Sequence, residues 1–398
     1  MKIKYWLIFL TLIFIVFKGY SQKPPEDDNE MRDLLGGSIM TAVPFLLISP
    51  DAVSGSMGDI GVATAPDLYS QHWNPAKYPF IDSKTGFSLT YSPWLRSLVQ
   101  DMHLLYLSGY YKLDERSAIS GSLTFFSLGE ILFTQSSQDA GTPYRPNEYA
   151  FDLAYSRSFT ENFSMAIAGR YIRSDLTQGY VAPGQSSNHA AQSAAADVAF
   201  FYRKPVEIQG YKGSAYSIGL NITNIGAKVS YSEAARKDFL PTNLKLGGGY
   251  SLDFDDYNRL SIYLELNKLL VPTPPVMDND TIVKGKSSDV GVMEGIIQSF
   301  SDAPGGFREE LAEWSWSVGA EYKYTDILSF RGGYFHEAAE KGKRQYLTAG
   351  VGLKFNVITL DVSYLMPTAG GNASNPLKNT LRFSLGFNFG EYLRQNKK

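Results

Sequence analysis

The sequence predicts an all-β fold: a transmembrane antiparallel β-barrel of about 14 strands with an N-terminal hatch segment. From Gly86 onward, segments of roughly ten residues alternate apolar and polar side chains, which gives a strand two different faces. The connections between these segments alternate between short and long, as in outer-membrane barrels. Aromatic residues make up 14% of the 398 residues, a content typical of aromatic girdles at a membrane interface.

The composition argues against several other classes of protein. A formal net charge of −3 gives no global field that favours nucleic acid as a partner. The chain has no Cys and 4 His, which excludes a disulfide framework and disfavours a structural zinc site. Motifs for a nucleophile elbow, a zinc protease or a phosphate-binding loop are absent from the sequence. We therefore expect no catalytic residue, no cofactor and no metal.

The N-terminal residues predict export. Lys2 and Lys4 precede an apolar run from Trp6 to Phe17, and Gly19-Tyr20-Ser21 ends the pattern of a signal peptide over residues 1–21. The alternative, a retained anchor, is disfavoured because a spanning helix needs roughly 20 apolar residues. Residues 22–40 are charged and contain Pro, so we expect a flexible periplasmic tether there.

Residues 41–80 predict a compact hatch that fills the mouth of the barrel. Between Thr41 and Tyr78, apolar side chains mix with Pro, Gly, Asp and Ser at a spacing that fits neither a strand nor an amphipathic helix. Within it, His72 can contact Asp67, and a structural role for that histidine is favoured over a catalytic one. The residues expected to build the hatch are Pro44, Phe45, Ser49, Pro50, Asp51, Met57, Gly58, Asp59, Asn74, Pro75 and Ala76.

The barrel is expected between residues 86 and 390, followed by a tail over residues 391–398. The predicted strands are 86–92, 103–112, 117–128, 148–158, 162–174, 192–203, 214–223, 242–252, 258–270, 313–324, 327–337, 344–355, 357–367 and 379–390. The connection from Lys204 to Gly213 is a longer exception among the short turns. An even strand count places both termini on the periplasmic side and the long loops outside.

Charged side chains on the inner faces predict ion pairs across the lumen. The expected pairs join three carboxylates with three cations: Glu265, Asp361 and Glu321 with Lys245, Lys354 and Arg382. We favour this structural account over acid–base catalysis.

The longest connection, Val271 to Ala312, is the candidate site for a partner. It contains an apolar stretch from Val290 to Phe300 that either binds a partner or folds over the barrel mouth, and the sequence leaves both open. The candidate binding residues are Val290, Val292, Met293, Ile296, Ile297 and Phe300.

Short motifs in the hatch resemble a known family. Asn74-Pro75-Ala76, after Asp67-Leu68-Tyr69-Ser70, resembles the hatch of the FadL family of outer-membrane channels. Pro44-Phe45-Leu46, Ser49-Pro50-Asp51-Ala52, and Met57-Gly58-Asp59 before Gly61-Val62-Ala63-Thr64 are similar to PorV, the FadL-like barrel family of the Bacteroidetes type IX secretion system. That family often has Arg-Ala-Gly after Ser-Pro-Asp-Ala, whereas Val53-Ser54-Gly55 stands here and lacks the positive charge.

The resemblance implies an outer-membrane shuttle and not an enzyme. A protein of this kind receives cargo from the type IX translocon barrel by binding the cargo's C-terminal signal domain at the cell surface. It then delivers the cargo to a sortase-like attachment complex that joins it to lipopolysaccharide. The alternatives are a FadL-like channel for hydrophobic small molecules and, with less support, a lipopolysaccharide O-deacylase, for which the sequence offers no nucleophile–base pair.

Overall fold

In the computed structural model, the described residues are 38–95, 101–133, 141–177, 188–232, 237–278, 281–368, 377 and 380–390. The predicted signal peptide, the tether up to residue 37 and the C-terminal tail lie outside them. Among the described residues, no helix has both the length and the apolar character needed to cross a membrane.

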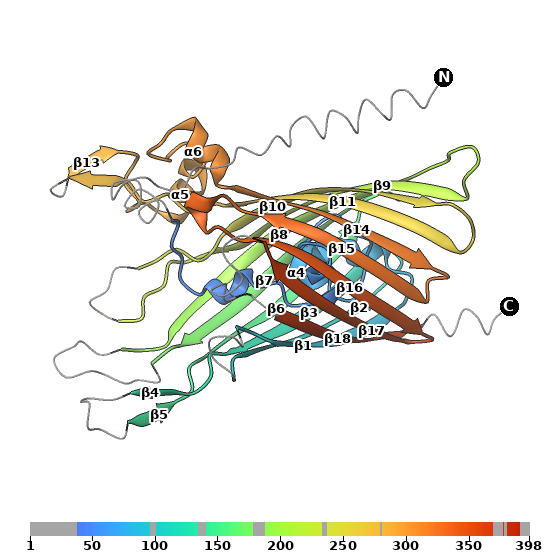
Figure 1. Cartoon of the computed structure of the whole chain (residues 1–398), viewed down its shortest axis with the longest axis horizontal. Coiled ribbons are helices and arrows are strands. Elements are labelled where there is room, and N and C mark those ends of the chain that lie inside the picture. The colour runs from blue at the N-terminus through green and yellow to red at the C-terminus, as the bar shows by residue number, and fades with distance from the viewer. Residues whose placement is uncertain are drawn as a thin grey trace.

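Fourteen antiparallel strands close into one barrel, which confirms the predicted fold class (Figure 1). Each strand pairs with its neighbours in sequence, and β1 pairs with β18 to close the ring. The strands are β1 (Thr85–Pro93), β2 (His103–Lys112), β3 (Ser117–Ser127), β6 (Asn147–Ser158), β7 (Phe163–Asp175), β8 (Ala191–Val206), β9 (Gly213–Gly226), β10 (Asn243–Asp253), β11 (Asn258–Leu269), β14 (Trp314–Tyr324), β15 (Leu328–His336), β16 (Gln345–Phe355), β17 (Ile358–Pro367) and β18 (Thr380–Phe389).

Every predicted strand overlaps one of these, and one predicted connection was too long. The segment from Lys204 to Gly213 was expected to be a long turn, but β8 continues to Val206 and pairs with β9 there. The pairing runs through Pro205, which lies near the strand end where a missing N–H costs the ladder little. The connection therefore shortens to residues 207–212, but it remains the longest turn at its end of the barrel, as predicted.

Additional elements lie in the long connections, and Figure 1 shows them at the same end of the barrel. Two small hairpins pair β4 (Ile131–Phe133) with β5 (Thr142–Tyr144) and β12 (Val276–Asp278) with β13 (Thr281–Lys284). Helices α5 (Val292–Gln298) and α6 (Phe307–Ala312) complete the connection between β11 and β14. A short 3-10 turn, η3 (Ala339–Lys341), lies between β15 and β16.

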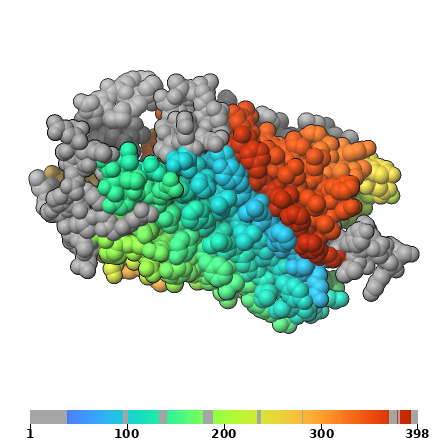
Figure 2. Space-filling view, turned by 90° about the horizontal axis from the view of Figure 1, so that it is seen from below, coloured from blue at the N-terminus to red at the C-terminus, as the bar shows by residue number. Residues whose placement is uncertain are grey.

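The barrel is apolar outside and polar inside. In β1, Phe87, Leu89 and Tyr91 are exposed, while the alternate side chains Ser88 and Thr90 are buried. Figure 2 shows the outer face at the closing seam, where blue β1 lies beside red β18. Apolar side chains facing outward from a closed barrel are the arrangement that a lipid bilayer stabilises.

Residues 41–84, which we call the hatch segment, lie within the ring of strands (Figure 1). The segment contains η1 (Pro44–Leu47), α3 (Ala52–Gly55), α4 (Ser70–Trp73) and η2 (Pro75–Phe80). Its side chains are among the most buried in the protein, including those of Trp73 and Lys77. No run of its residues is long enough to form a stable helix alone, so contacts with the wall must hold it in place.

Candidate functional site

Asp51 joins the two halves of the hatch segment. Its carboxylate accepts a hydrogen bond from the backbone N–H of Ser54 at 2.8 Å and so caps α3. The other carboxylate oxygen accepts a hydrogen bond from Nε1 of Trp73 at 2.6 Å. One buried side chain thus fixes both the start of α3 and the end of α4.

Both the oxygen and the nitrogen of the Asn74 side-chain amide form hydrogen bonds. Its Oδ1 accepts from the N–H of Ala76 at 3.0 Å, and its Nδ2 donates to the carbonyls of Val62 and Phe200 at 2.9 Å each. Pro75 follows at the first position of η2, where its missing N–H is no loss. The Asn-Pro-Ala turn therefore connects the hatch segment both to itself and to β8.

Most of the remaining predicted hatch residues contact the barrel wall. Phe45 stacks on Phe126 of β3, and Pro44 begins η1. The carbonyl of Ser49 accepts a hydrogen bond from Nε of Arg382 at 3.1 Å, and Pro50 beside it is buried. Met57 and Gly58 lie against the backbone of β15, and Asp59 accepts a hydrogen bond from the phenol of Tyr346.

The possible contact between His72 and Asp67 is absent. The Asp67 carboxylate accepts hydrogen bonds from the hydroxyl of Ser70 and the N–H of Tyr69, because the local turn brings these donors closer. The His72 ring instead packs edge-on against Trp73 and Tyr106. Within the described part of the chain, the histidine has aromatic neighbours and no carboxylate hydrogen-bonded to its ring.

Inward-facing glycines of the wall let the hatch segment lie directly on the strand backbone. A Cβ atom at Gly219 would lie 2.0 Å from the carbonyl oxygen of Val62, and one at Gly333 would lie 2.1 Å from the carbonyl carbon of Met57. A Cβ atom would also lie 2.3 to 2.6 Å from the nearest atom of the hatch segment at five further positions: Gly86, Gly247, Gly319, Gly350 and Gly386. At Gly219, Gly319 and Gly333 the nearest atoms belong to the hatch backbone, so no larger residue fits there without displacing the segment, whereas at Gly247 the nearest atom is a methyl group of Val62 that can turn aside.

Of the residues expected to pair across the lumen, only Lys245 and Glu265 pair with each other, and they do so between neighbouring strands. Lys245 lies 3.6 Å from Glu265 on the neighbouring strand. Glu321 and Asp361 both pair with Arg331, at 2.7 Å each, and not with Lys354 or Arg382. Arg331 lies opposite Glu321 in the register and reaches Asp361 past Gly352, so its guanidinium serves two carboxylates. The sequence analysis missed Arg331 because alternation alone does not give the register.

A cavity of about 100 Å³ lies between the hatch segment and the outer connections. The hatch contributes Leu46, Asp59 and His72 to its lining, and the outer connections contribute Glu313, Lys341 and Arg344. Sites for drug-sized ligands usually measure about 300–1,000 Å³ and are mostly apolar. This cavity is smaller, and its lining mixes charged groups with apolar side chains such as Leu47, Leu269 and Phe335.

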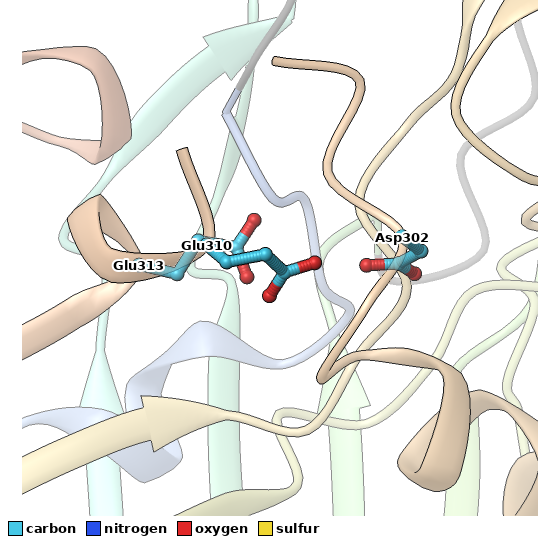
Figure 3. Close-up of side chains that lie close together, drawn as sticks. All are labelled: Asp302, Glu310 and Glu313. Carbon is cyan, nitrogen blue, oxygen red and sulfur yellow. The ribbon is translucent and has the colours of Figure 1, made fainter. Parts of the chain in front are cut away.

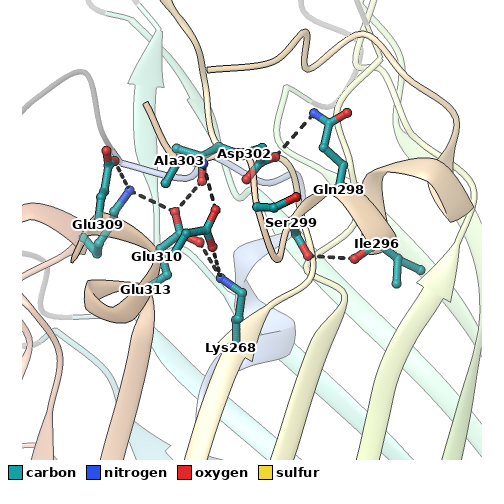
Figure 4. Close-up of polar contacts among 12 residues, drawn as sticks. Lys268, Ile296, Gln298, Ser299, Asp302, Ala303, Glu309, Glu310 and Glu313 are labelled. Atoms are coloured by element: carbon teal, nitrogen blue, oxygen red, sulfur yellow. Dashed lines mark hydrogen bonds and ion pairs between the residues drawn. The ribbon is translucent and has the colours of Figure 1, made fainter. Parts of the chain in front are cut away.

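A network of buried charges, the loop clamp, fixes the β11–β14 connection above this cavity (Figure 4). The buried ammonium of Lys268 lies 2.5 Å from Oε2 of Glu313 and 3.4 Å from Oε2 of Glu310. Oε1 of Glu313 accepts hydrogen bonds from Thr273 at 2.5 Å and from Lys341 at 3.1 Å. The clamp thus ties α6 to the end of β11 and to the β15–β16 connection.

Three carboxylates of this region approach one another as metal ligands do. Oxygens of Asp302, Glu310 and Glu313 lie within 4.8 Å of one another (Figure 3). However, the Lys268 ammonium already contacts the two glutamates, and Asp302 accepts from the N–H of Thr273 at 3.1 Å. Burial raises the pKa of Asp302 to about 6. The cluster is therefore occupied by protein cations, and we assign it no metal.

The apolar stretch of the same connection is divided between two environments. Val290, Val292 and Ile296 are half-buried, and Gly295 packs closely against Phe239. The exposed fractions are 63% for Met293, 72% for Ile297 and 48% for Phe300. The stretch therefore rests on the loops with one face and presents the other to its surroundings.

Two further apolar side chains were missed by the sequence analysis. Phe307 and Leu311, one turn apart on α6, are 78% and 55% exposed. Their spacing of four residues is a helical signal that was available in the sequence. We call Met293, Ile297, Phe300, Phe307 and Leu311 the outer apolar set.

Comparison with known proteins gives one family. The family described as "Type IX secretion system protein PorV" matches residues 32–276. No curated protein matches this chain in sequence.

Similar solved structures are barrels of comparable length. The toluene transporter TbuX of Ralstonia pickettii has 14% identity and a TM-score of 0.43, with 85% of this chain and 98% of that chain covered. The toluene transporter TodX of Pseudomonas putida has 12% identity and a TM-score of 0.45, with 84% and 96% covered. A FadL homologue of Pseudomonas aeruginosa has 11% identity and a TM-score of 0.40, with 89% and 100% covered.

Proposed function

The chain belongs to the PorV family of type IX secretion system proteins, and we propose that it is the cargo shuttle of that system in the outer membrane. The family match over residues 32–276 is the observation that carries the proposal. In this role the protein binds the folded C-terminal signal domain of secreted cargo at the translocon. It then delivers the cargo to the sortase-like complex that attaches it to the cell surface.

The outer apolar set supports this role as the contact surface for cargo. Its side chains belong to the longest connection of the described chain and are held outward by the loop clamp. Apolar side chains exposed together on a fixed scaffold mark interaction sites more often than isolated ones do. We assign the first contact with the cargo domain to Ile297 and Phe307, the two most exposed members for their size.

The same proposal fixes the orientation of the barrel. The connections with hairpins and helices face the extracellular medium, and the short turns and the end of β18 face the periplasm. The first described residues lie at the outer end, where the N–H of Ala42 donates to the carbonyl of Phe239 in the β9–β10 connection. The cargo surface then lies outside the cell, where the secreted signal domain emerges. Contacts with outer-membrane lipid and lipopolysaccharide follow from this placement.

The two other functions receive less support. A channel for hydrophobic small molecules needs an apolar path, whereas the lumen holds the hatch segment and a small cavity lined in part by charged groups. A deacylase needs an activated nucleophile, and His72, on the cavity lining, is oriented by no carboxylate in the described residues. We therefore propose a role in binding and transport without catalysis.

The test is affinity purification of the tagged protein from outer membranes, together with secretion by a deletion strain. The proposal predicts that translocon and signal-domain cargo are recovered with the protein, and that the deletion strain retains cargo in the periplasm. Recovery of neither partner, with normal secretion in the deletion strain, would refute it. Loss of uptake of hydrophobic compounds on deletion would favour the channel.

A further inference from the structure

Glu265, on β11, holds the centre of the hatch segment. This wall residue is fully buried, and its Oε2 accepts hydrogen bonds from the backbone N–H groups of Gly61 and Val62 at 2.8 and 2.9 Å. One wall side chain thus satisfies two backbone N–H groups that would otherwise be buried without a partner, which is costly. Val62 also lies against Gly219 of β9 with its carbonyl group and against Gly247 of β10 with its side chain, so the hatch segment contacts three consecutive strands here.

Arg382, on β18, holds the start of the hatch segment. Its buried guanidinium donates from Nε to the carbonyl of Ser49 and lies 3.5 Å from Asp59 through Nη2. The neighbouring Ser384 accepts from the N–H of Ala52 at 2.9 Å. In the order of strands, β18 is separated from β11 by β14, β15, β16 and β17, so the two charged contacts act from different sides.

Serine hydroxyl groups on β2, β3 and β7 contact the hatch segment from a third part of the wall. Ser108 of β2 donates to the carbonyl of Leu68 at 2.9 Å, and Ser120 of β3 donates to Oε1 of Gln71 at 2.6 Å. Ser164 of β7 donates to the carbonyl of Ala76. Polar groups of the hatch backbone thus have partners on the wall in several directions, and moving the segment would leave them unpaired in a buried place.

We propose that the hatch segment is a permanent seal, latched to the barrel wall by Glu265 and Arg382, and that it does not open as a gate. Wall and segment are matched by shape as well as by charge, because the inward glycines leave room for this one position of the segment. The barrel then works with its outer surface alone, and nothing passes through its lumen. This inference concerns the lumen only and stands whether or not the barrel carries cargo.

A disulfide across the contact tests the proposal, since the chain has no native cysteine. A Cβ at Gly247 would lie 3.3 Å from the Cβ of Ala63, just below the usual separation of about 3.5–4.5 Å in a disulfide, so Ala63→Cys with Gly247→Cys is the suitable pair once the Val62 side chain, 2.5 Å from that Cβ, has turned aside. The oxidised and reduced forms of this one protein are compared in cells for cargo secretion and in planar bilayers for conductance. We expect no difference in secretion and no conductance in either form. Secretion by the reduced form alone, or conductance that oxidation abolishes, would overturn the proposal.

Removing the latch gives the complementary test. The double variant Glu265→Ala with Arg382→Ala should open a path, seen as bilayer conductance and as sensitivity of cells to large antibiotics. Glu321→Ala is the matched control, because this buried wall carboxylate pairs with Arg331 and not with the hatch segment. Resistance to SDS shows whether the double variant is folded. A folded double variant that does not conduct would overturn the role of the two residues. If a strain without the protein secretes normally, the shuttle proposal fails, while the conductance result still decides the seal.

Discussion

Gly333 and Met57 lie so close together that a Cβ atom on Gly333 would be 2.1 Å from the carbonyl carbon of Met57. The neighbouring Gly332 faces the other way, and a Cβ there would have its closest contact at 3.7 Å. One glycine is thus required by the hatch segment and the next is not. The difference shows that the inner wall of the barrel is shaped to the segment it contains.

The glycine pair gives a direct prediction. Gly333→Ala should lower the temperature at which the barrel unfolds in SDS, because the methyl group must displace the hatch backbone, at a cost of about 1–3 kcal/mol. Gly332→Ala is the control and should leave that temperature within a few degrees of the wild-type value, since its methyl group faces outward. Heat modifiability on SDS gels measures both. Equal effects of the two substitutions would contradict the close contact.

The loop clamp predicts the behaviour of Lys268→Ala. This change leaves the buried carboxylates of Glu310 and Glu313 without their shared cation, and breaking a buried pair costs roughly 3–5 kcal/mol. Trypsin should then cut the β11–β14 connection much faster at Lys284, Lys286 and Arg308. Lys212→Ala, which removes an exposed pair with Asp256, should not change the cleavage rate. Unaltered cleavage in Lys268→Ala would mean that the clamp does not hold the loop.

Asp302 predicts a pH dependence of the same connection. Burial raises its pKa from 3.8 to about 6, so the folded loop binds this proton more tightly than the unfolded chain does. The contribution to stability therefore increases as the pH falls from about 6 towards about 4, and it is lost as the pH rises through about 6. The ratio of the trypsin cleavage rate at pH 7 to the rate at pH 5 should be larger for the wild type than for Asp302→Asn, with both proteins measured side by side. An identical ratio in the two proteins would exclude Asp302 as the titrating group.

The outer apolar set predicts a loss of cargo binding without a loss of stability. Met293→Glu with Ile297→Glu places charges on two exposed side chains, so the barrel should fold normally and bind the cargo signal domain at least tenfold more weakly. Ile208→Glu, in the short turn after β8, is the control for an exposed apolar residue at the opposite end. Cargo affinity of the purified proteins is the measurement. Normal affinity in the double variant would move the cargo site to another loop.

The sequence predicted the strands well because each strand of a membrane barrel carries its own alternating pattern. Thr85–Pro93 and Gln345–Phe355, for example, lie within a residue or two of their predicted bounds. Pro205 misled the prediction, because a proline at a strand end resembles a turn. Gly332 and Gly333 are adjacent in the sequence, and only the three-dimensional structure shows that Gly333 faces Met57 and Gly332 does not.

Contacts between residues far apart in the sequence were harder to predict from the sequence. Lys245 and Glu265 were both expected to form ion pairs, and they pair with each other because they lie on adjacent strands with a tight turn between them. The pairs of Lys268 with Glu313 and of Arg382 with Asp59 join segments far apart in sequence. Nothing in local periodicity identifies such partners, and the clamp and the latch therefore became visible only in three dimensions.

Site-specific photocrosslinking from Ile297 in intact cells tests the central claim most directly. A photoreactive residue at this exposed position should crosslink to the C-terminal signal domain of cargo, while the same residue at Ile208 should not. Crosslinks to cargo from Ile297 and none from Ile208 are the predicted result. Absence of cargo crosslinks from Ile297, with the protein present in the outer membrane at its normal level, would contradict the proposed cargo surface.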